Sequence, residues 1–280
     1  MMLNPIYNGS PIISVKGVTQ ILGFSEEKII LLLNDIDSYY IEKPRYKDDG
    51  TSRMTYIVRE PLKTIQQQIK ENIFSKLIFP SYLTGSIKDK ENPRDHIKNA
   101  FYHLNKVWII KLDIKDYYPS IMTRHILHMW RHFFNFSNEA SEILTKLVTY
   151  NGFLPQGSST SAVIANLILW EKEPRLVQQF KQSGFCYTRY VDDITISSKK
   201  RIEKKEIQAI IGRISYLLKS YDMKLNRKKT QFLTRNQRMS VTGRNVNSNK
   251  VTLPNNKRGN TRTAVLQFEK KQVLQKVGMN

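Results

Sequence analysis

Residues 185–198, FCYTRYVDDITISS, hold two short runs rich in β-branched and aromatic residues on either side of a pair of acids. Runs of this composition predict two strands, Phe185–Tyr190 and Ile194–Ser198, joined as an antiparallel hairpin with Asp192 and Asp193 at its tip. An Asp-Asp pair alone is typical of a solvated turn, because Asp is a common turn former. What the pair does therefore depends on which other residues the fold brings to it.

A third acid ends another predicted strand. Residues 107–113, VWIIKLD, form a nearly continuous apolar run, which indicates a buried strand with Asp113 at or near its C-terminal end. Two acids on a hairpin and a third on a neighbouring strand can hold two Mg²⁺ ions, which prefer hard oxygen ligands and leave room for phosphate oxygens. Without cations, burying three carboxylates together is costly. On spacing alone, a two-metal site and three ordinary solvated acids both remain open.

The remaining pattern alternates helices with short strands, which predicts an α+β class with a mainly antiparallel sheet. Ser25 precedes two acids and an apolar run, as at the start of a capped helix. A basic hairpin is expected within 40–58, with its turn at Asp48-Asp49-Gly50, and 80–96 is expected to be mainly loop. Further helices are predicted over Pro61–Ile73, Thr123–Phe134, Ser137–Tyr150, Ser159–Trp170 and Ile202–Tyr221, and further short strands over Val241–Gly243 and Val246–Leu253.

Composition limits the class of protein. The 280 residues carry 45 Lys and Arg against 24 Asp and Glu, a net charge of +21, on a length that suits one large domain or two closely joined ones. Such a charge favours nucleic acid as the partner over an anionic membrane or a surface that is basic only for solubility. Cys186 is the only cysteine, which fits a reducing cytosol. No apolar stretch approaches the roughly 20 residues of a membrane span, and no signal peptide is visible, so we expect a cytoplasmic protein without a membrane partner.

Four motifs, taken together, resemble those of reverse transcriptases. Tyr190-Val191-Asp192-Asp193 resembles the YxDD box of that family. Residues 112–121 (LDIKDYYPSI) resemble its first palm motif, 154–161 (LPQGSSTS) with Ala165-Asn166 the next, and 225–230 (LNRKKT) the later lysine-bearing motif. They follow the family's order within 107–250. The resemblance implies a right-hand polymerase of fingers, palm and thumb, with an antiparallel palm sheet that carries the catalytic acids.

Two further strings resemble retron reverse transcriptases of bacteria. Residues 99–103 (NAFYH) fit the NAxxH element of that group and 241–243 (VTG) fit its VTG element, so the resemblance covers 15–253. It implies an RNA-directed DNA polymerase that copies a structured noncoding RNA into DNA from dNTPs, in antiphage defence with a separate effector protein. Two alternatives are another defence-associated reverse transcriptase with template-independent or protein-primed synthesis, and an RNA-binding scaffold that sequesters an effector.

The resemblance also implies a division of the chain. Residues 1–106 would form the N-terminal helices and fingers, 107–240 the palm, and 241–280 a short thumb and C-terminal region. Within the last part, 255–260 is a polar linker and Thr263–Val277 is expected to form one basic helix. A thumb this short is either minimal or completed by a partner. The oligomeric state stays open.

Roles for the acids and for one lysine follow from the matched motifs. By resemblance, Asp113, Asp192 and Asp193 are catalytic and hold two Mg²⁺ ions, or Mn²⁺, with the backbone carbonyl of Ile114 as a further ligand. Lys229 is implied as the general acid for the pyrophosphate leaving group. The adjacent Lys228 is the alternative, and either lysine could instead contact the nucleic-acid backbone.

Substrate contacts are implied at four further positions. Arg53, with Arg59 as the alternative, would grip the triphosphate, because Arg suits bidentate phosphate contacts. Tyr118 would be the steric gate under the incoming sugar, or else a core aromatic residue. Gln156 and Gly157 would lie near the incoming base and sugar, or else form an ordinary turn.

Nucleic-acid contacts are implied for the two retron strings and the YxDD tyrosine. Asn99 and His103 would either shape the junction of fingers and palm or contact the cognate RNA. Tyr190 would support the primer end or the floor of the hairpin. The VTG element, Val241, Thr242 and Gly243, is assigned to nucleic-acid binding on the same grounds.

Overall fold

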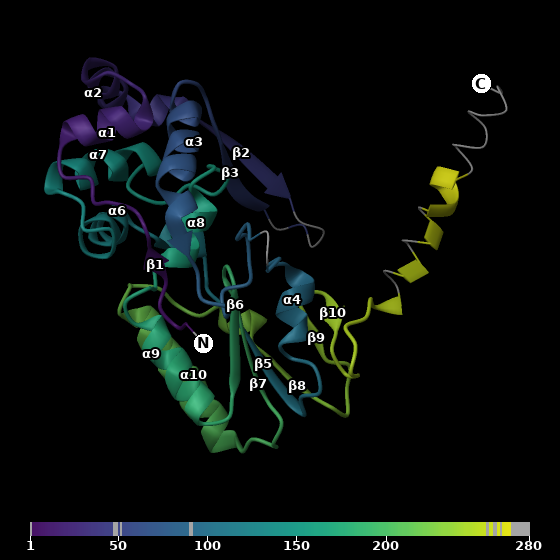
Figure 1. The fold of residues 1–280 in the computed structure, drawn as a ribbon. Coiled ribbons are helices and arrows are strands. Elements are labelled where there is room, and N and C mark those ends of the chain that lie inside the picture. Colours follow the sequence, from purple (N-terminus) through teal and green to yellow (C-terminus); the bar gives the residue numbers. More distant parts are fainter. Residues whose placement is uncertain are drawn as a thin grey trace, which may run out of the picture.

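The computed structural model describes residues 2–46, 50, 52–89, 92–255, 258–259, 262–263 and 265–269. Within them helices and short antiparallel strands alternate along the chain, which confirms the predicted α+β class (Figure 1). The α-helices are α1 Val15–Leu22, α2 Glu26–Asn34, α3 Leu62–Asn72, α4 His96–Phe101, α5 Tyr117–Ser120, α6 Thr123–His128, α7 Asn138–Val148, α8 Ser161–Leu167, α9 Glu173–Gln182 and α10 Lys204–Lys219. The strands are β1 Ile6–Tyr7, β2 Tyr40–Tyr46, β3 Ser52–Val58, β4 Leu77–Ile78, β5 Trp108–Asp113, β6 Cys186–Tyr190, β7 Asp193–Ser198, β8 Gln231–Thr234, β9 Ser240–Val241 and β10 Arg244–Asn245.

A four-stranded antiparallel sheet with the order β6-β7-β5-β8 is the centre of the molecule. The predicted hairpin is β6–β7, and its second strand pairs with the predicted buried strand β5. In that register Trp108 faces Ser198 and Asp113 faces Asp193. The pairing therefore brings acids from two distant parts of the chain to one end of the sheet.

Both faces of this sheet are covered, and β5 shows how. Ile110 and Leu112 belong to the main core on one face, where α9 and α10 lie (Figure 1). Ile109 points to the opposite face and packs in a smaller core with Ala100 of α4 and Val241 of β9. Burial on two sides explains why the strand is apolar at consecutive positions. By alternation, Asp113 lies on the face of Ile109, toward α4 and the β9–β10 hairpin.

Above the sheet in Figure 1, a helical layer supports the β2–β3 hairpin. Its core is aromatic: Phe74 stacks on Trp130 with ring centroids 5.5 Å apart, and Phe134 packs on both rings. The hairpin is fastened to this layer through Tyr40 and Tyr56, whose rings both contact Tyr150. Its opposite surface, which carries Arg53, is left free to face the sheet edge.

Several helices follow the prediction closely. Ser25 caps α2 by accepting a hydrogen bond from the Lys28 N–H, and Ser137 caps α7 in the same way. Helix Thr123–His128 continues into a π-helical turn over Met129–Phe133, and short 3₁₀ turns occupy Ile36–Tyr39, Phe74–Lys76 and Arg227–Lys229. The predicted loop over 80–96 has no helix or strand among its described residues until α4 begins at His96.

Other elements differ from the prediction. Helix α9 and strand β8 were not predicted, although Glu173-Pro174 followed by Leu176, Val177 and Phe180 is a helix-start signal with helical spacing. The predicted strand Val241–Gly243 is wrong in part: β9 ends at Val241, and Thr242 and Gly243, both with positive φ, form a two-residue turn to β10. Val246–Leu253 forms no strand and contributes one bridge, between Asn245 and Thr252.

Two predictions fall partly on positions that are not described. Asp48 and Asp49 of the expected hairpin turn lie outside the described residues, as do positions 256, 257 and 260 of the expected linker. Of the expected helix Thr263–Val277, residues 265–269 are helical and 270–277 lie outside the description. Among the residues that are described, no helix is long and apolar enough to cross a membrane.

The two retron strings form one structural joint. The Asn99 side chain accepts a hydrogen bond from Thr84 Oγ1 at 2.9 Å and approaches Thr242 Oγ1 at 3.5 Å. The His103 ring lies between Ser197 Oγ of β7 and Thr188 Oγ1 of β6, at 2.7 Å from each. Burial lowers the pKa of His103 to about 3, so the folded protein holds this imidazole neutral. These contacts hold α4 and the β9–β10 turn against the face of the sheet on which Asp113 lies.

His103 should make the protein sensitive to acid. Between pH 6.5 and about 3 the unfolded chain takes up a proton on this ring and the folded protein does not, so stability falls as pH decreases. The fall approaches about 1.4 kcal/mol per pH unit. In His103→Asn this part of the pH dependence should vanish in urea unfolding between pH 7 and 5. The same substitution at exposed His132 is the control, and equal slopes in all three proteins would contradict the account.

Candidate active site

The three acids meet at the end of the sheet where β5 and the β6–β7 hairpin finish. Asp113 is the last residue of β5, Asp193 is the first residue of β7, and the two are partners in the register. Asp192 occupies the turn, and its carbonyl accepts a hydrogen bond from the Ile114 N–H at 3.0 Å. Asp113 is buried and Asp193 is exposed. The predicted cluster is therefore formed, with one carboxylate under the surface and one at it.

The turn that presents Asp192 is tight and conformationally unusual. Tyr190 pairs with Asp193, which leaves only Val191 and Asp192 between the strands. Val191 has φ of 58°, a conformation that β-branched residues rarely adopt, and its side chain is buried. Gly85 makes room for it, because a Cβ at Gly85 would stand 2.9 Å from the Val191 N and Cγ2 atoms. The surrounding structure thus imposes the shape of this turn.

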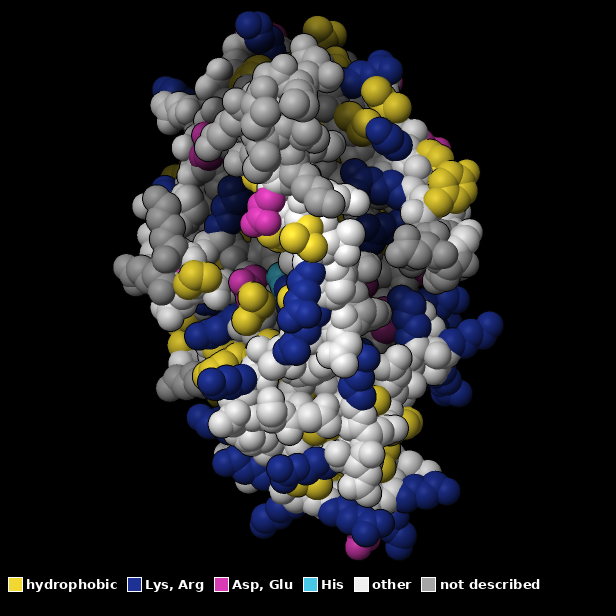
Figure 2. Space-filling model, turned by 90° about the vertical axis from the view of Figure 1, so that its right-hand side faces the viewer, with side chains coloured by type: hydrophobic (Ala, Val, Ile, Leu, Met, Phe, Trp, Pro, Cys, Tyr) yellow, Lys and Arg dark blue, Asp and Glu magenta, His cyan; other side chains and the backbone are white. Residues whose placement is uncertain are grey.

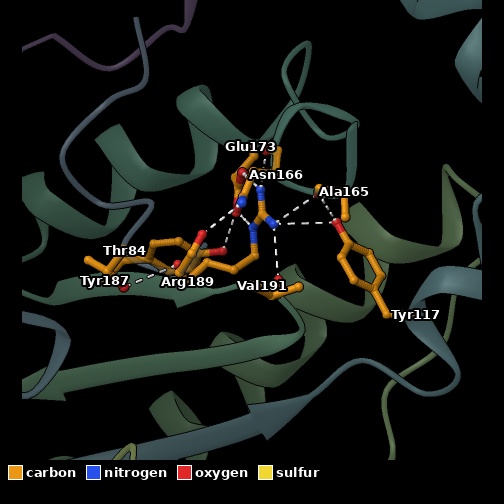
Figure 3. Close-up of polar contacts among 9 residues, drawn as sticks. Thr84, Tyr117, Ala165, Asn166, Glu173, Tyr187, Arg189 and Val191 are labelled. Carbon is orange, nitrogen blue, oxygen red and sulfur yellow. Dashed lines mark hydrogen bonds and ion pairs between the residues drawn. The ribbon is translucent and has the colours of Figure 1, made fainter. Parts of the chain in front are cut away.

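One buried arginine binds a backbone carbonyl of the turn (Figure 3). Arg189, fully buried, donates from Nη1 to the Val191 carbonyl at 3.0 Å and from Nη2 to the Asn166 carbonyl at 2.8 Å. Its charge is matched by Glu173, with Nε–Oε1 at 2.6 Å and Nη2–Oε2 at 2.8 Å. Tyr187 also donates to this carboxylate. The network joins α8, α9 and β6 to the peptide that carries Asp192.

Burial and mutual repulsion raise the pKa values of two of the acids. Although the Asp193 side chain reaches the surface, the surrounding protein desolvates its carboxylate, and this desolvation together with the charges of Asp192 and Asp113 raises the pKa to about 6. For Asp192, burial and the charge of Asp113 also raise the pKa, against an opposing backbone hydrogen bond. A divalent cation would stabilise the ionised forms of these carboxylates, and hard oxygen donors suit Mg²⁺ or Mn²⁺. Among the described residues, no group of three His, Cys, Asp or Glu side chains is positioned to hold a metal ion as it stands.

Of the two adjacent lysines, Lys229 is the one that faces the acids. Its Nζ lies 2.8 Å from Asp113 Oδ1, and this hydrogen bond raises the pKa of the ammonium group. Lys228 lines a separate groove behind the site. The Asn226 N–H donates to the Asp113 carbonyl at 2.8 Å, so the segment that carries Lys229 is itself fastened to β5.

A cavity of about 540 Å³ lies between the β2–β3 hairpin and residues 156–162, and none of the three acids lines it. The four residues predicted to contact the substrate all line this cavity: Arg53, Tyr118, Gln156 and Gly157. Burial and the nearby charge of Asp192 raise the pKa of Tyr118 to about 12, which keeps its hydroxyl protonated. Arg59 does not line this cavity. Asp192 interacts electrostatically with both Tyr118 and Arg53, so the acids lie near this cavity although they do not line it.

Gly157 has a structural reason to be glycine. It adopts φ of 123°, and a Cβ there would collide with the carbonyl oxygen of Tyr56 in β3. The Tyr56 N–H donates to the Gln156 carbonyl at 2.8 Å. The Gln156-Gly157 turn is thus fastened against β3 by a close approach of the two backbones.

The residues assigned to nucleic-acid binding separate into two groups. Asn99, His103 and Val241 are fully buried, which disfavours direct contact with RNA and fits the alternative role at the junction. Thr242 and Gly243 reach the surface and, with Lys111 and Asp193, line a cavity of about 350 Å³ on the active face. Tyr190 is half-buried next to the turn. The VTG turn therefore borders the acids although its valine does not.

Sequence reasoning missed Arg189, Glu173 and Lys111. Arg189 stands inside the YxDD hairpin, and a charged residue on a strand that is otherwise apolar on that face was the available signal. Lys111 lies on β5 on the same face as Asp113, and burial lowers the pKa of its ammonium group. Figure 2 shows Lys and Arg side chains spread over this side of the molecule with few acids among them.

The fold and the site define a class. The family described as "Reverse transcriptase (RNA-dependent DNA polymerase)" matches residues 41–252, which include every acid, lysine and turn described above. The chain belongs to the reverse transcriptase family.

Within that family the similar proteins are retron enzymes of bacteria. The chain is 32% identical to the retron Se72 reverse transcriptase of Salmonella heidelberg over 86% of its own length and 64% of the relative's. It is 29% identical to the retron Ec48 and Ec86 reverse transcriptases of Escherichia coli, over 88% and 81% of this chain and 62% and 69% of theirs. The chain thus spans about two thirds of the length of these relatives.

Solved structures support the same fold at greater distance. Telomerase from Candida albicans, in complex with a TWJ fragment of telomeric RNA, matches 76% of this chain and 46% of its own with a TM-score of 0.52 at 12% identity. Apo telomerase from Candida tropicalis, truncated from its C-terminal domain, matches 90% and 57% with a TM-score of 0.51 at 13% identity. The predicted α+β polymerase fold is confirmed.

Breaking the buried ion pair should destabilise the protein strongly. Glu173→Gln leaves the Arg189 charge buried without a counterion, and removing one partner of such a pair costs about 3–5 kcal/mol. The control is Glu142→Gln, which breaks the exposed pair between Arg131 and Glu142 and should cost about 1 kcal/mol or less. Urea unfolding of the variants measures both costs. A loss at Glu173 no larger than the loss at Glu142 would refute the assigned role of the buried pair.

Proposed function

We propose that the protein is an RNA-directed DNA polymerase that copies a structured noncoding RNA into DNA. The observation that carries this proposal is the meeting of Asp113, Asp192 and Asp193 at one sheet edge, near Tyr118 and Arg53, which line the adjacent cavity. A scaffold that only held RNA would have no need for clustered acids in a cationic cleft. The family and the named retron relatives support the same activity.

The reaction assigned to the site is nucleotidyl transfer. The primer hydroxyl attacks the α-phosphorus of a dNTP, a new P–O bond forms, and the bond to pyrophosphate breaks. Two divalent ions, when bound to the acids, would activate the attacking oxygen and stabilise the leaving one. Asp113 and Asp192 are the proposed main ligands, with Asp193 beside them and the Ile114 carbonyl as a further donor.

The neighbouring side chains have complementary tasks. Lys229 stays protonated because its pKa is raised, and it is the proposed donor of a proton to the leaving pyrophosphate. Arg53, which lines the cavity, would hold the triphosphate with a bidentate contact. Tyr118, on the wall of the same cavity, would exclude a 2′-hydroxyl by contact with its ring. Gln156 and Gly157, whose backbone contacts β3, would lie near the incoming base and sugar.

The biological setting is proposed from the relatives. Named relatives include retron reverse transcriptases, so the template proposed here is a structured RNA encoded nearby. A 2′-hydroxyl of that RNA would serve as primer, and the setting would be cytoplasmic antiphage defence with an effector protein. Protein-primed or template-independent synthesis by another defence-associated reverse transcriptase is the rival, and sequencing of the product after nuclease digestion distinguishes them.

DNA synthesis should depend on the turn aspartate. The purified protein with its co-bound RNA, given dNTPs and Mg²⁺, is expected to make labelled DNA. Asp192→Asn should lower the rate by about 100-fold or more, because it removes a ligand of the ions that stabilise charge in the transition state. The control is Asp116→Asn, the same change at an exposed acid near Asp113. DNA formed equally by Asp192→Asn would overturn the site, and RNA binding without any DNA would favour the scaffold.

Sugar discrimination should depend on the ring at position 118. Tyr118→Ala removes the ring and should raise ribonucleotide incorporation relative to deoxynucleotide incorporation by about 10-fold or more. Tyr118→Phe keeps the ring and should retain the discrimination of the wild type. Single-nucleotide incorporation kinetics with matched rNTP and dNTP measure the ratio. An unchanged ratio in Tyr118→Ala would place Tyr118 in the core instead.

A further inference from the structure

A large basic groove lies behind the acids, outside the site described above. It has a volume of about 1000 Å³ and runs between the end of α10 and the segment 222–228. None of the three acids lines it. Five cationic residues do: Lys115, Lys219, Lys224, Arg227 and Lys228. All five are exposed.

The charge of this groove is not neutralised within the protein. Among the described residues, none of the five cations takes part in an ion pair. The one acid that lines the groove, Asp222, is paired with Arg124 at 2.9 Å. Five uncompensated charges in one hollow repel one another and attract a polyanion.

An aromatic side chain indicates which polyanion fits. Tyr216 of α10 does not itself line the groove, but it is 79% exposed and precedes the groove residue Lys219 by three residues, so the two side chains share a face of the helix. Exposed aromatic rings among cations are typical of surfaces that stack unpaired bases and bind the phosphates between them. A membrane surface fits less well, because the apolar residues Ile214 and Leu218 of α10 are buried in the protein core.

The floor of the groove is joined to the active site by the backbone. The Lys115 N–H donates to the Lys224 carbonyl at 2.8 Å, and the Asn226 N–H donates to the Asp113 carbonyl. In the 3₁₀ turn Arg227–Lys229, Lys229 contacts Asp113, whereas Arg227 and Lys228 line the groove. A strand of RNA in the groove would thus lie one peptide segment away from the chemistry without entering it.

We propose that this groove binds a single-stranded RNA segment outside the template–primer duplex, through its phosphates and by base stacking on Tyr216. The proposal rests on the proposed function for its choice of RNA. It gives the enzyme a second hold on the same RNA molecule. Two linked contacts raise the effective concentration of the template at the acids.

The test compares two double variants with the same change in charge. Lys219→Ala/Lys224→Ala removes two groove lysines, and Lys204→Ala/Lys205→Ala removes two exposed lysines from the opposite end of α10. The probes are a short RNA–DNA template–primer and the same duplex with an oligo(U) extension of about 16 nucleotides on either RNA end. Affinities are measured over a series of salt concentrations, after thermal unfolding has shown both variants to be folded.

The extension should increase the RNA affinity of the wild type and of the control variant. In the groove variant this gain in affinity should be about 10-fold smaller. Its salt dependence on the extended probe should be shallower by about 1.4 in log–log slope, for two phosphates no longer neutralised. Equal gains in both variants, or no gain from either extension, would overturn the proposal. Loss of binding to phosphatidylglycerol vesicles without loss of the RNA gain would assign the groove to a membrane surface instead.

Failure of this proposal is distinguishable from failure of the polymerase assignment. Primer extension on the short duplex tests the acids, and the groove variant should perform it at the wild-type rate. If no DNA is made but the RNA affinity still depends on Lys219 and Lys224, the groove remains an RNA-binding site and the polymerase assignment is rejected. Cross-linking of a 4-thiouridine extension to the peptide that contains Tyr216 locates the contact directly.

Discussion

The arrangement of the active edge depends on the hydrogen bond from Arg189 to the Val191 carbonyl. Val191 is in a conformation that its own side chain disfavours, and the turn is held against β5 by the packing around Val191, by this bond and by the bond from the Ile114 N–H to the Asp192 carbonyl. Glu173 compensates the arginine's charge, so the turn is tied to α9 as well as to the sheet. A buried pair of this kind contributes little net stability, but it selects one geometry among several. Here that geometry is the one that brings a carboxylate beside Asp113.

Much of the fold could be predicted because local pattern and tertiary environment agree. The β6–β7 hairpin and β5 were predictable from composition and from the position of their acids, since both faces of β5 are buried and the hairpin tip is polar. Helix α9 was missed although its period is regular, and β8 has only four residues, which is too short for a periodic signal. The strand predicted over Val241–Gly243 illustrates the opposite error: β-branched residues suggested extension, whereas Gly243 and positive φ at Thr242 make a turn.

The residues of the site were predictable from the sequence, but the contacts that hold them in place were not. The acids and Lys229 follow from motifs, and the structure brings them within one constellation. The sequence could not show that Gly157 accommodates the Tyr56 carbonyl or that His103 is sealed between two hydroxyls, because both depend on segments far apart in the chain. The structure also separates Lys228 from Lys229, which adjacency alone left equivalent. These buried contacts therefore join motif residues to partners, such as Tyr56, Thr188 and Ser197, that no motif marks.

The central claim is that Asp113, Asp192 and Asp193 form a cation site because the sheet register and the Val191 turn bring them together. Titration of the protein with Mn²⁺, followed by electron paramagnetic resonance with a dNTP and a template–primer present, tests it most directly. The account predicts saturable Mn²⁺ binding that is lost in Asp113→Asn and in Asp192→Asn and retained in Asp116→Asn. Equal Mn²⁺ binding by all four proteins would contradict it.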